Sequence, residues 1–320
     1  MDLKTIQKAQ ATLAPFVHPS PLIRCYALEK RLGCKERIFL KCEQLHTTGS
    51  FKVRGAFNAL LSLSSEEKRR GVITRSAGNF GAALAFAGKE LQIPVTIILP
   101  ESVPKAKLNQ MVSYGAETVL KKTRQEEEET VKRLAQEKNL VPLSPYNHLA
   151  VIAGQGTIAL EIFDAFPTIR HFFCPLGGGG LLCGIGVACK ALDPKIQIIG
   201  IEPNGANDYL LSRKAKKKIT LEKVTTIADG LVAPTVGDLN YPILEQCVDT
   251  VETVPDEKII EAMRFLYDEV GMIIEPSGAT SVAGLMAHKR LDGDAVCILS
   301  GCNVDKGRFY AWVAKNSPAR

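Results

Sequence analysis

Short apolar runs alternate with longer amphipathic stretches along most of this 320-residue chain, and this alternation constrains its fold more than any other feature. Four of the apolar runs are Val72–Thr74, Val95–Leu99, Phe172–Leu176 and Ile196–Ile201. Repeated alternation of this kind predicts parallel strands whose sheets are covered by helices on both faces. We therefore expect an α/β fold with two lobes, each with a mainly parallel sheet flanked by helices.

No internal repeat or low-complexity linker divides the chain, so a second lobe is expected to be inserted rather than appended. We predict a small inserted domain at residues 70–148 and a large domain made of residues 1–69 and 149–320. In such sheets, ligands bind beyond the carboxyl ends of the strands, where a strand passes into a helix. Those junctions are the expected place for a functional site.

Composition excludes several other kinds of protein. No apolar stretch reaches the roughly 18–20 residues that span a bilayer, and the polar N-terminus lacks the apolar core of a signal peptide. The nine cysteines are scattered without a C-x-x-C pair, which indicates reduced thiols in a cytoplasmic protein. The densest basic run, Arg213–Lys218, is interpreted as a solvated helix end, because nucleic-acid binding needs a broader basic surface. We expect no nucleic acid and no membrane as partners.

Four consecutive glycines, Gly177 to Gly180, directly follow the apolar run Phe172–Leu176. They would bring successive backbone N–H groups close to a ligand, and the next helix would add the positive end of its dipole. The run is neither a P-loop nor a G-x-G-x-x-G motif. Four glycines in a row cost conformational entropy, so a phosphate cradle is favoured over a purely structural turn.

A lysine stands at a predicted helix start. Ser50 is the predicted N-cap of a helix over Phe51–Ser62, which places Lys52 in the first turn. The positive end of the helix dipole disfavours protonation there, and burial would lower the pKa further. A lysine with a lowered pKa is what imine formation requires. Taken alone, however, Lys52 is better explained as an ordinary surface lysine.

Two further junctions carry polar groups. The segment Ser76–Asn79 follows the predicted strand Val72–Thr74 and leaves backbone N–H groups free for a carboxylate. Ser300 follows the last predicted strand, where a hydroxyl could meet a neutral ring nitrogen. Each alone is typical of an ordinary turn. Together with Lys52 and the glycine run, they supply an amine nucleophile, a carboxylate site, a phosphate site and a ring-nitrogen partner.

The segment Gly49–Ala56 resembles the lysine signature of fold-type II enzymes that use pyridoxal phosphate (PLP), above all serine/threonine dehydratases and serine racemases. Further matches follow in the same order over nearly the whole chain, at Ser20–Leu22, Ser76–Asn79, Gly154–Thr157, Gly177–Leu181, Ala228–Gly230, Glu275–Ala279 and Ser300–Asn303. So many ordered matches argue strongly against chance. The resemblance implies a fold similar to the tryptophan synthase β-subunit, with PLP as the cofactor.

The resemblance also implies roles for individual residues. Lys52 is the expected Schiff-base lysine and catalytic base, and Ser300 is expected to face the pyridine nitrogen. The residues expected to bind the substrate carboxylate are Ser76, Ala77 and Asn79. The remaining expected PLP contacts are Phe51, Asn79 at the phenolic oxygen, Glu275, and Gly177, Gly178, Gly179, Gly180 and Leu181 at the phosphate.

A divalent cation site is suggested by the same resemblance at Glu202, the Ala206 carbonyl and Asp208. Carboxylate and carbonyl oxygens suit Mg²⁺ or Ca²⁺, although ordinary acids at a helix entry are the alternative. Related enzymes usually form dimers, so a homodimer is expected. The chain ends at Arg320, soon after the last predicted strand, so no regulatory domain like that of biosynthetic threonine dehydratases is expected.

The expected reaction is β-elimination from a small hydroxy amino acid, which converts L-threonine or L-serine to 2-oxobutanoate or pyruvate and ammonia. Racemases of this group carry a serine directly before Gly-Asn, where this chain has Ala77, so a second acid/base group is missing. The alternatives are a serine racemase, a 3-hydroxyaspartate ammonia-lyase, or a PLP-binding protein with little catalysis, which the intact Lys52 and Ser300 disfavour. Phe80 and Cys302 replace a common histidine and glycine and leave the preferred substrate open.

Overall fold

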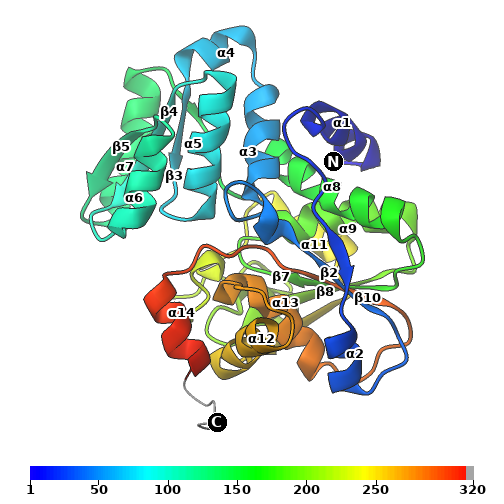
Figure 1. Ribbon diagram of the computed structural model, residues 1–320. Coiled ribbons are helices and arrows are strands. Elements are labelled where there is room, and N and C mark those ends of the chain that lie inside the picture. The colour runs from blue at the N-terminus through cyan, green and yellow to red at the C-terminus, as the bar shows by residue number, and fades with distance from the viewer. Residues whose placement is uncertain (315–320) are drawn as a thin grey trace.

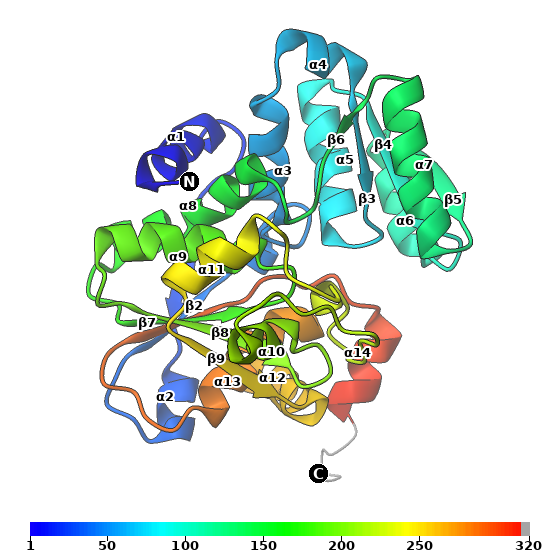
Figure 2. The same ribbon diagram turned by 180° about the vertical axis from the view of Figure 1, so that it is seen from behind.

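The computed structural model describes residues 1–314 and contains two separate sheets, which Figures 1 and 2 show from opposite sides. The strands of the six-stranded sheet, in spatial order, are β1 (Leu22–Arg24), β2 (Ile38–Lys41), β10 (Ala295–Ile298), β7 (His171–Pro175), β8 (Gln197–Pro203) and β9 (Thr250–Val254). Those of the four-stranded sheet are β5 (Glu117–Lys121), β4 (Val95–Pro100), β3 (Val72–Arg75) and β6 (Val141–Pro142). Only the pairing of β1 with β2 is antiparallel among these strands, so the predicted mainly parallel α/β fold is confirmed.

Helices connect most of the strands. In the first half of the chain they are α1 (Leu3–Leu13), α2 (Tyr26–Leu32), α3 (Lys52–Leu61), α4 (Ser65–Arg70), α5 (Asn79–Leu91), α6 (Lys105–Ser113), α7 (Arg124–Glu137) and α8 (Leu149–Ala165). In the second half they are α9 (Gly180–Leu192), α10 (Asp208–Ala215), α11 (Asn240–Cys247), α12 (Asp256–Asp268), α13 (Pro276–Ala287) and α14 (Lys306–Val313). Two 3₁₀ turns, η1 (Glu43–Leu45) and η2 (Asp229–Leu231), complete the described elements.

Both faces of the six-stranded sheet are covered. Helices α1, α8, α9 and α11 enclose one apolar core, which includes Ile158 and Phe172. Helices α2, α12, α13 and α14 enclose the other, which includes Leu28 and Ile259. The two layers are visible above and below the sheet in Figure 1. This is the two-faced burial that makes the strands of parallel sheets continuously apolar.

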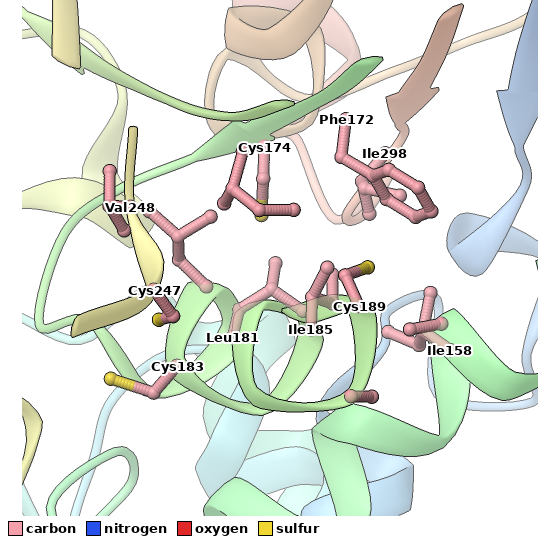
Figure 3. Close-up of a cluster of buried hydrophobic side chains, with 14 of the residues drawn as sticks. Ile158, Phe172, Cys174, Leu181, Cys183, Ile185, Cys189, Cys247, Val248 and Ile298 are labelled. Carbon is pink, nitrogen blue, oxygen red and sulfur yellow. The ribbon is translucent and has the colours of Figure 1, made fainter. Parts of the chain in front are cut away.

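Most of the cysteines belong to these cores. Figure 3 shows Cys174 on β7, Cys183 and Cys189 on α9, and Cys247 at the end of α11 among buried aliphatic side chains. All nine cysteines of the chain are free thiols. Burial raises the pKa of these thiols, for Cys247 to about 12, so they behave as small apolar residues rather than as nucleophiles.

The four-stranded sheet is also covered on both faces. Helices α3, α5 and α6 pack on one face, where Phe57, Leu84 and Ile97 are buried. Helix α7 packs on the other face, against Ile73 and Ile98. Because α3 precedes residue 70 and yet shares this core, the predicted boundaries of the small domain, 70 and 148, stay a prediction. None of the described helices has the length and apolar character to cross a membrane.

Candidate active site

One cavity of about 280 Å³ lies where the carboxyl ends of β3, β7 and β10 meet the starts of α3, α5, α9 and α13. The predicted site residues that line it are Phe51, Lys52, Ser76, Asn79, Gly177, Gly178, Gly179, Gly180, Leu181, Glu275 and Ser300. Parallel α/β sheets place ligands at this edge, because strand ends and helix starts converge there. Tertiary structure thus brings together junctions that are far apart in the sequence.

Lys52 is the first residue of α3, and its side chain extends into the cavity. Its Nζ donates a hydrogen bond to the Pro145 carbonyl at 3.0 Å and lies 4.9 Å from the centre of the Phe51 ring. Loss of hydration lowers the pKa of Lys52 to about 8, although the nearby Glu275 acts in the opposite direction. A substantial fraction of neutral amine is therefore available near neutral pH, as imine formation requires.

The predicted N-cap of this helix is wrong. The N-cap residue is Phe51, with no side-chain cap, and the Ser50 hydroxyl is buried without a hydrogen-bond partner among the described residues. The reason is that Ser50 forms an isolated antiparallel bridge with Gly301, while the Phe51 N–H donates to the Ser300 carbonyl at 3.1 Å. Long-range pairing with the end of β10 therefore replaces local capping and fixes Lys52 opposite Ser300.

The glycine loop closes one end of the cavity at the start of α9. Gly179 has φ +93°, and a Cβ on Gly178 would lie 2.5 Å from ring atoms of Tyr146, so neither position tolerates a side chain without strain. Asn240 Nδ2 donates to the Gly178 carbonyl at 2.6 Å and holds the loop. Within residues 1–314, the backbone N–H groups of Gly178, Gly179 and Gly180 donate no hydrogen bond. These free donors at a helix N-terminus fit the phosphate of PLP.

A chain of hydrogen bonds links Asn303, Asn79 and Glu275 beside the cavity. Asn79 Nδ2 donates to Glu275 Oε1 at 2.7 Å, and Asn303 Nδ2 donates to Asn79 Oδ1 at 2.9 Å. Burial, and then the charge of Asp229, raises the pKa of Glu275 to about 8, so this carboxyl group holds a proton near neutral pH. The amide of Asn79 has a second N–H, which would remain for the phenolic oxygen of PLP. That contact stays a prediction.

The two serines have different neighbours. Ser300 is buried at the end of β10 and lines the cavity. Ser76 Oγ accepts a hydrogen bond from the Gly81 N–H at 3.2 Å, which stabilises the turn into α5. Ala77 does not line the main cavity; it lines an adjoining cavity between α6 and α14. Of the three residues expected at the substrate carboxylate, the structure therefore brings Ser76 and Asn79 to the main cavity and leaves Ala77 beside it.

The residues suggested for a cation lie away from this cavity, at the end of β8 and the start of α10. Both oxygens of Glu202 accept backbone N–H groups, from Tyr209 at 3.0 Å and Leu210 at 2.8 Å, and Asp208 Oδ2 accepts from Val236 at 2.7 Å. Asp208 Oδ1 is buried without a partner in the described part of the chain. Burial raises the pKa of Glu202 to about 8 and that of Asp208 to about 7.

Two buried carboxyl groups that form no ion pair within residues 1–314, one with an unpaired oxygen, would suit a hard cation together with the buried Ala206. The described residues contain no group of three or more histidine, cysteine or acidic side chains arranged to hold a metal. Any cation here would therefore depend on the Ala206 carbonyl and on water to complete its ligands.

Several residues of the active cavity were not assigned roles from the sequence, namely Arg75, Lys107, Arg124, Tyr146 and Asp229. Asp229 belongs to one of the matching motifs, which was its only signal. The others come from the end of β3, from α6 and α7, and from the segment before α8. Their role could not be predicted from the sequence, because they are far from Lys52 along the chain and only the packing of the two sheets brings them to the cavity.

Comparison with known proteins agrees with this geometry. A model of the family described as "Pyridoxal-phosphate dependent enzyme" matches residues 13–301. A serine racemase of Arabidopsis thaliana is 38% identical over 317 residues, which cover 97% of this chain and 95% of the racemase. The L-threo-3-hydroxyaspartate ammonia-lyase of Saccharomyces cerevisiae is 36% identical over 309 residues, which cover 96% of this chain and 94% of the lyase.

A solved structure gives the same result for the fold. The structure of maize serine racemase matches with a TM-score of 0.93 at 37% identity and covers 98% of this chain and 97% of its own. The cavity, the glycine loop and the lysine of lowered pKa lie within the matched residues. The chain therefore belongs to the pyridoxal-phosphate-dependent enzymes of fold type II, in the group that includes serine racemases and ammonia-lyases.

Proposed function

We propose that this protein is an ammonia-lyase that removes water and then ammonia from a small β-hydroxy amino acid, with L-threonine and L-serine as the simplest substrates. One observation favours elimination over racemisation. Lys52 provides a base in the cavity. Position 77, where the racemases that this chain resembles carry a serine, is an alanine that has no transferable proton and lines the adjoining cavity.

When bound, PLP supplies an electron sink for the negative charge formed at the substrate Cα. Lys52 removes the Cα proton, because its neutral amine is available near pH 8. The turn at Ser76–Asn79 orients the substrate carboxylate through backbone N–H groups at the start of α5. Ser300 lines the same cavity and would offer a neutral hydroxyl to the ring nitrogen of PLP, which would favour loss of the β-hydroxyl.

The bond changes balance without any further reactant. The Cα–H and Cβ–O bonds break, and the hydroxyl leaves as water. The released enamine then reacts with water to give a 2-oxo acid and ammonia. The chain's contribution is to hold the substrate, to move the Cα proton at Lys52 and to keep water from the carbanion while the cavity is closed.

Serine racemisation is the second candidate. The similarity to the serine racemases of Arabidopsis and maize supports racemisation more than it supports dehydration. Racemisation would need a proton from the face opposite Lys52, and water would have to supply it in place of Ala77. The two reactions share every step up to removal of the Cα proton, so they differ only in what happens to the carbanion.

A direct assay separates these functions. The purified holoenzyme is given L-serine, L-threonine, D-serine and L-threo-3-hydroxyaspartate, and 2-oxo acid, ammonia and the enantiomers of the remaining substrate are measured. We expect 2-oxo acid and ammonia to form in equal amounts and faster than the opposite enantiomer. A protein with the visible absorbance of lysine-bound PLP that leaves all four compounds unchanged would rule out both enzymatic functions.

The Ala77→Ser variant tests the reason for the choice. A serine there would supply the missing proton, so the ratio of racemisation to elimination should rise. Ala77→Gly is the matched control and should leave the ratio unchanged. If Ala77→Ser has no effect on the ratio either, the residue at position 77 does not decide between the two reactions.

We further propose that Glu202, the Ala206 carbonyl and Asp208 bind Mg²⁺ or Ca²⁺ in a structural or activating role. The buried Asp208 Oδ1 without a described partner supports this site, because an unpaired buried carboxylate is costly unless a cation compensates it. We also expect a homodimer, which sedimentation equilibrium of the holoenzyme would test.

A further inference from the structure

Asn240, the first residue of α11, is fully buried and is not among the residues that line the active cavity. Its side-chain nitrogen nevertheless holds two backbone carbonyls beside that cavity, because Nδ2 donates to Gly178 at 2.6 Å and to Tyr146 at 3.1 Å. An amide nitrogen has two N–H groups, so one side chain can make both bonds. Asn240 Oδ1 is buried without a partner within residues 1–314, so these two bonds are the polar contacts of the side chain there.

The bond to Gly178 fixes the direction of the next N–H group. The Gly178 carbonyl also accepts the Gly237 N–H at 3.1 Å, so two donors hold it in place. A carbonyl and the N–H that follows it belong to one planar unit, and in a trans peptide they point in opposite directions. None of the described peptide bonds is cis. The Gly179 N–H, which donates no hydrogen bond in the described part of the chain, is therefore turned away from Asn240.

The second bond connects Asn240 to the segment that contacts Lys52. Lys52 Nζ donates to the Pro145 carbonyl at 3.0 Å, and Asn240 holds the next carbonyl along the chain, that of Tyr146. This segment lies directly on the glycine loop, because a Cβ on Gly180 would be 2.8 Å from the Tyr146 carbonyl oxygen. The amine and the glycine loop would bind opposite ends of one cofactor, and the segment between them is fastened to the loop by Asn240.

A neighbouring asparagine makes the reverse connection. Asn147 Oδ1 accepts the Leu239 N–H at 2.9 Å, so Asn147 joins the same two segments, and within residues 1–314 it forms no hydrogen bond to the glycine loop. Only the Asn240 amide reaches the Gly178 carbonyl. Asn240 does not cap α11 either, because the N-cap is Leu239 and no side chain bonds there. The two asparagines therefore differ in their contact with the glycine loop, which makes Asn147 a matched control for Asn240.

We propose that Asn240 is a positioning residue for the cofactor phosphate, which holds the Gly178 carbonyl outward and thereby directs the Gly179 N–H at the phosphate. Gly179 lines the cavity and Asn240 does not, so an N–H that is turned away from Asn240 faces the space where the phosphate fits. A hydrogen bond to an ionised acceptor is about twice as strong as one between neutral groups, and it weakens steeply when its alignment is lost. This role concerns cofactor binding and is the same whether the reaction is elimination or racemisation.

Pyridoxal, which lacks the phosphate, separates this role from general support of the fold. The wild-type apoprotein and its Asn240→Ala and Asn240→Asp variants are titrated with PLP and with pyridoxal, and the visible absorbance of the lysine-bound cofactor is measured. We expect each variant to bind PLP about 10- to 100-fold more weakly, as the loss of one hydrogen bond to a charged group implies. The affinity for pyridoxal should stay at the wild-type value, because pyridoxal has no phosphate for the Gly179 N–H to bind.

Inorganic phosphate gives a second measurement that does not involve Lys52. Calorimetry of the apoprotein should show weaker binding of inorganic phosphate in both Asn240 variants than in the wild type. Asn147→Ala is the control and should leave the affinities for PLP, pyridoxal and inorganic phosphate unchanged. Circular dichroism shows whether each variant is folded. Asn240→Ala removes the donors without adding charge and Asn240→Asp removes them at nearly constant size, so either variant tests the proposal if the other fails to fold.

Three results would overturn the proposal. An equal loss of affinity for PLP and pyridoxal would make Asn240 a support of the fold or of Lys52. Unchanged affinities for PLP and inorganic phosphate would show that the glycine loop keeps its direction without this amide. The same selective loss in Asn147→Ala would assign the effect to the link between the two segments. None of these measurements uses a substrate, so a protein without lyase activity can still confirm the role of Asn240.

Discussion

Two cations lie in the first turn of α3, and their surroundings differ sharply. Lys52 has the Pro145 carbonyl as its only hydrogen-bond partner among the described residues, whereas Arg54, 1% exposed, bonds both Glu43 and Glu161. Loss of hydration lowers the pKa of Lys52 to about 8. For Arg54 the same loss of hydration is outweighed by Glu43 and Glu161, which raise its pKa. A local counter-charge, rather than burial as such, separates the reactive cation from the structural one.

The cluster around Arg54 also shows what the structural cation does. Glu43 follows β2, Glu161 lies on α8, and Lys41 on β2 bonds Glu161 as well at 2.6 Å. The buried ion pairs therefore join the six-stranded sheet, α3 and α8 around the helix that begins at Lys52. Rigid support of this kind keeps a reactive side chain in its productive position.

The largest expected effect concerns the reactive cation. Lys52→Ala removes the base and the amine that binds PLP, so kcat for 2-oxo acid formation should fall about 10⁴-fold. The fold should persist, because no counter-ion is left unpaired, and circular dichroism would check this. Lys52→Arg is the control for charge. If Lys52→Ala retained more than a hundredth of wild-type kcat, another residue would have to be the base.

Replacing Arg54, the structural cation, should lower the stability of the fold rather than the catalytic rate. Arg54→Met leaves Glu43 and part of the charge of Glu161 buried without a partner, so the free energy of unfolding should fall by about 3–5 kcal/mol. Urea denaturation of the apoprotein measures this value. Arg133→Met, at an exposed pair on α7, is the control and should cause little change. Similar losses for both variants would contradict the contrast between the two cations.

Glu202 and Asp208 are buried acids that form no ion pair within residues 1–314, in contrast to Glu43 and Glu161 at Arg54. If Mg²⁺ or Ca²⁺ binds there, addition of the ion at about 100 times its Kd should stabilise the fold by roughly 2.7 kcal/mol, and a chelator should reverse this. Thermal unfolding with and without chelator measures the effect. Glu202→Gln should remove the dependence on the ion, and an unchanged midpoint in the wild type would rule out binding.

The smallest expected effect is a shift in a pH profile. Only the neutral amine of Lys52 attacks PLP, so the rate at which the apoprotein regains visible absorbance should rise with pH and level off above about 8. Because Glu275 raises the pKa of Lys52, Glu275→Gln should move the midpoint to lower pH. A wild-type midpoint near 10.5, the ordinary value for lysine, would show that the amine is hydrated.

Much of the site was predictable because it lies at local patterns. The apolar runs placed the parallel strands, and the glycine run and the lysine segment placed the ends of the cofactor site. The prediction failed at Ser50, where a bridge to Gly301 overrides local capping. It gave no role to Tyr146 or Arg124, because nothing in their neighbouring residues indicates a ligand.

The sequence by itself therefore determined the mainly parallel α/β fold, the position of Lys52 at a helix start and the four-glycine turn, since these depend on residues close together in the chain. Only the tertiary structure decided the charge environment of each group. Asn79 meets Glu275 across 196 residues, and Arg54 meets Glu161 across 107. The protonation of a buried group depends on such distant partners, so the reactivity of Lys52 became visible only in the folded molecule.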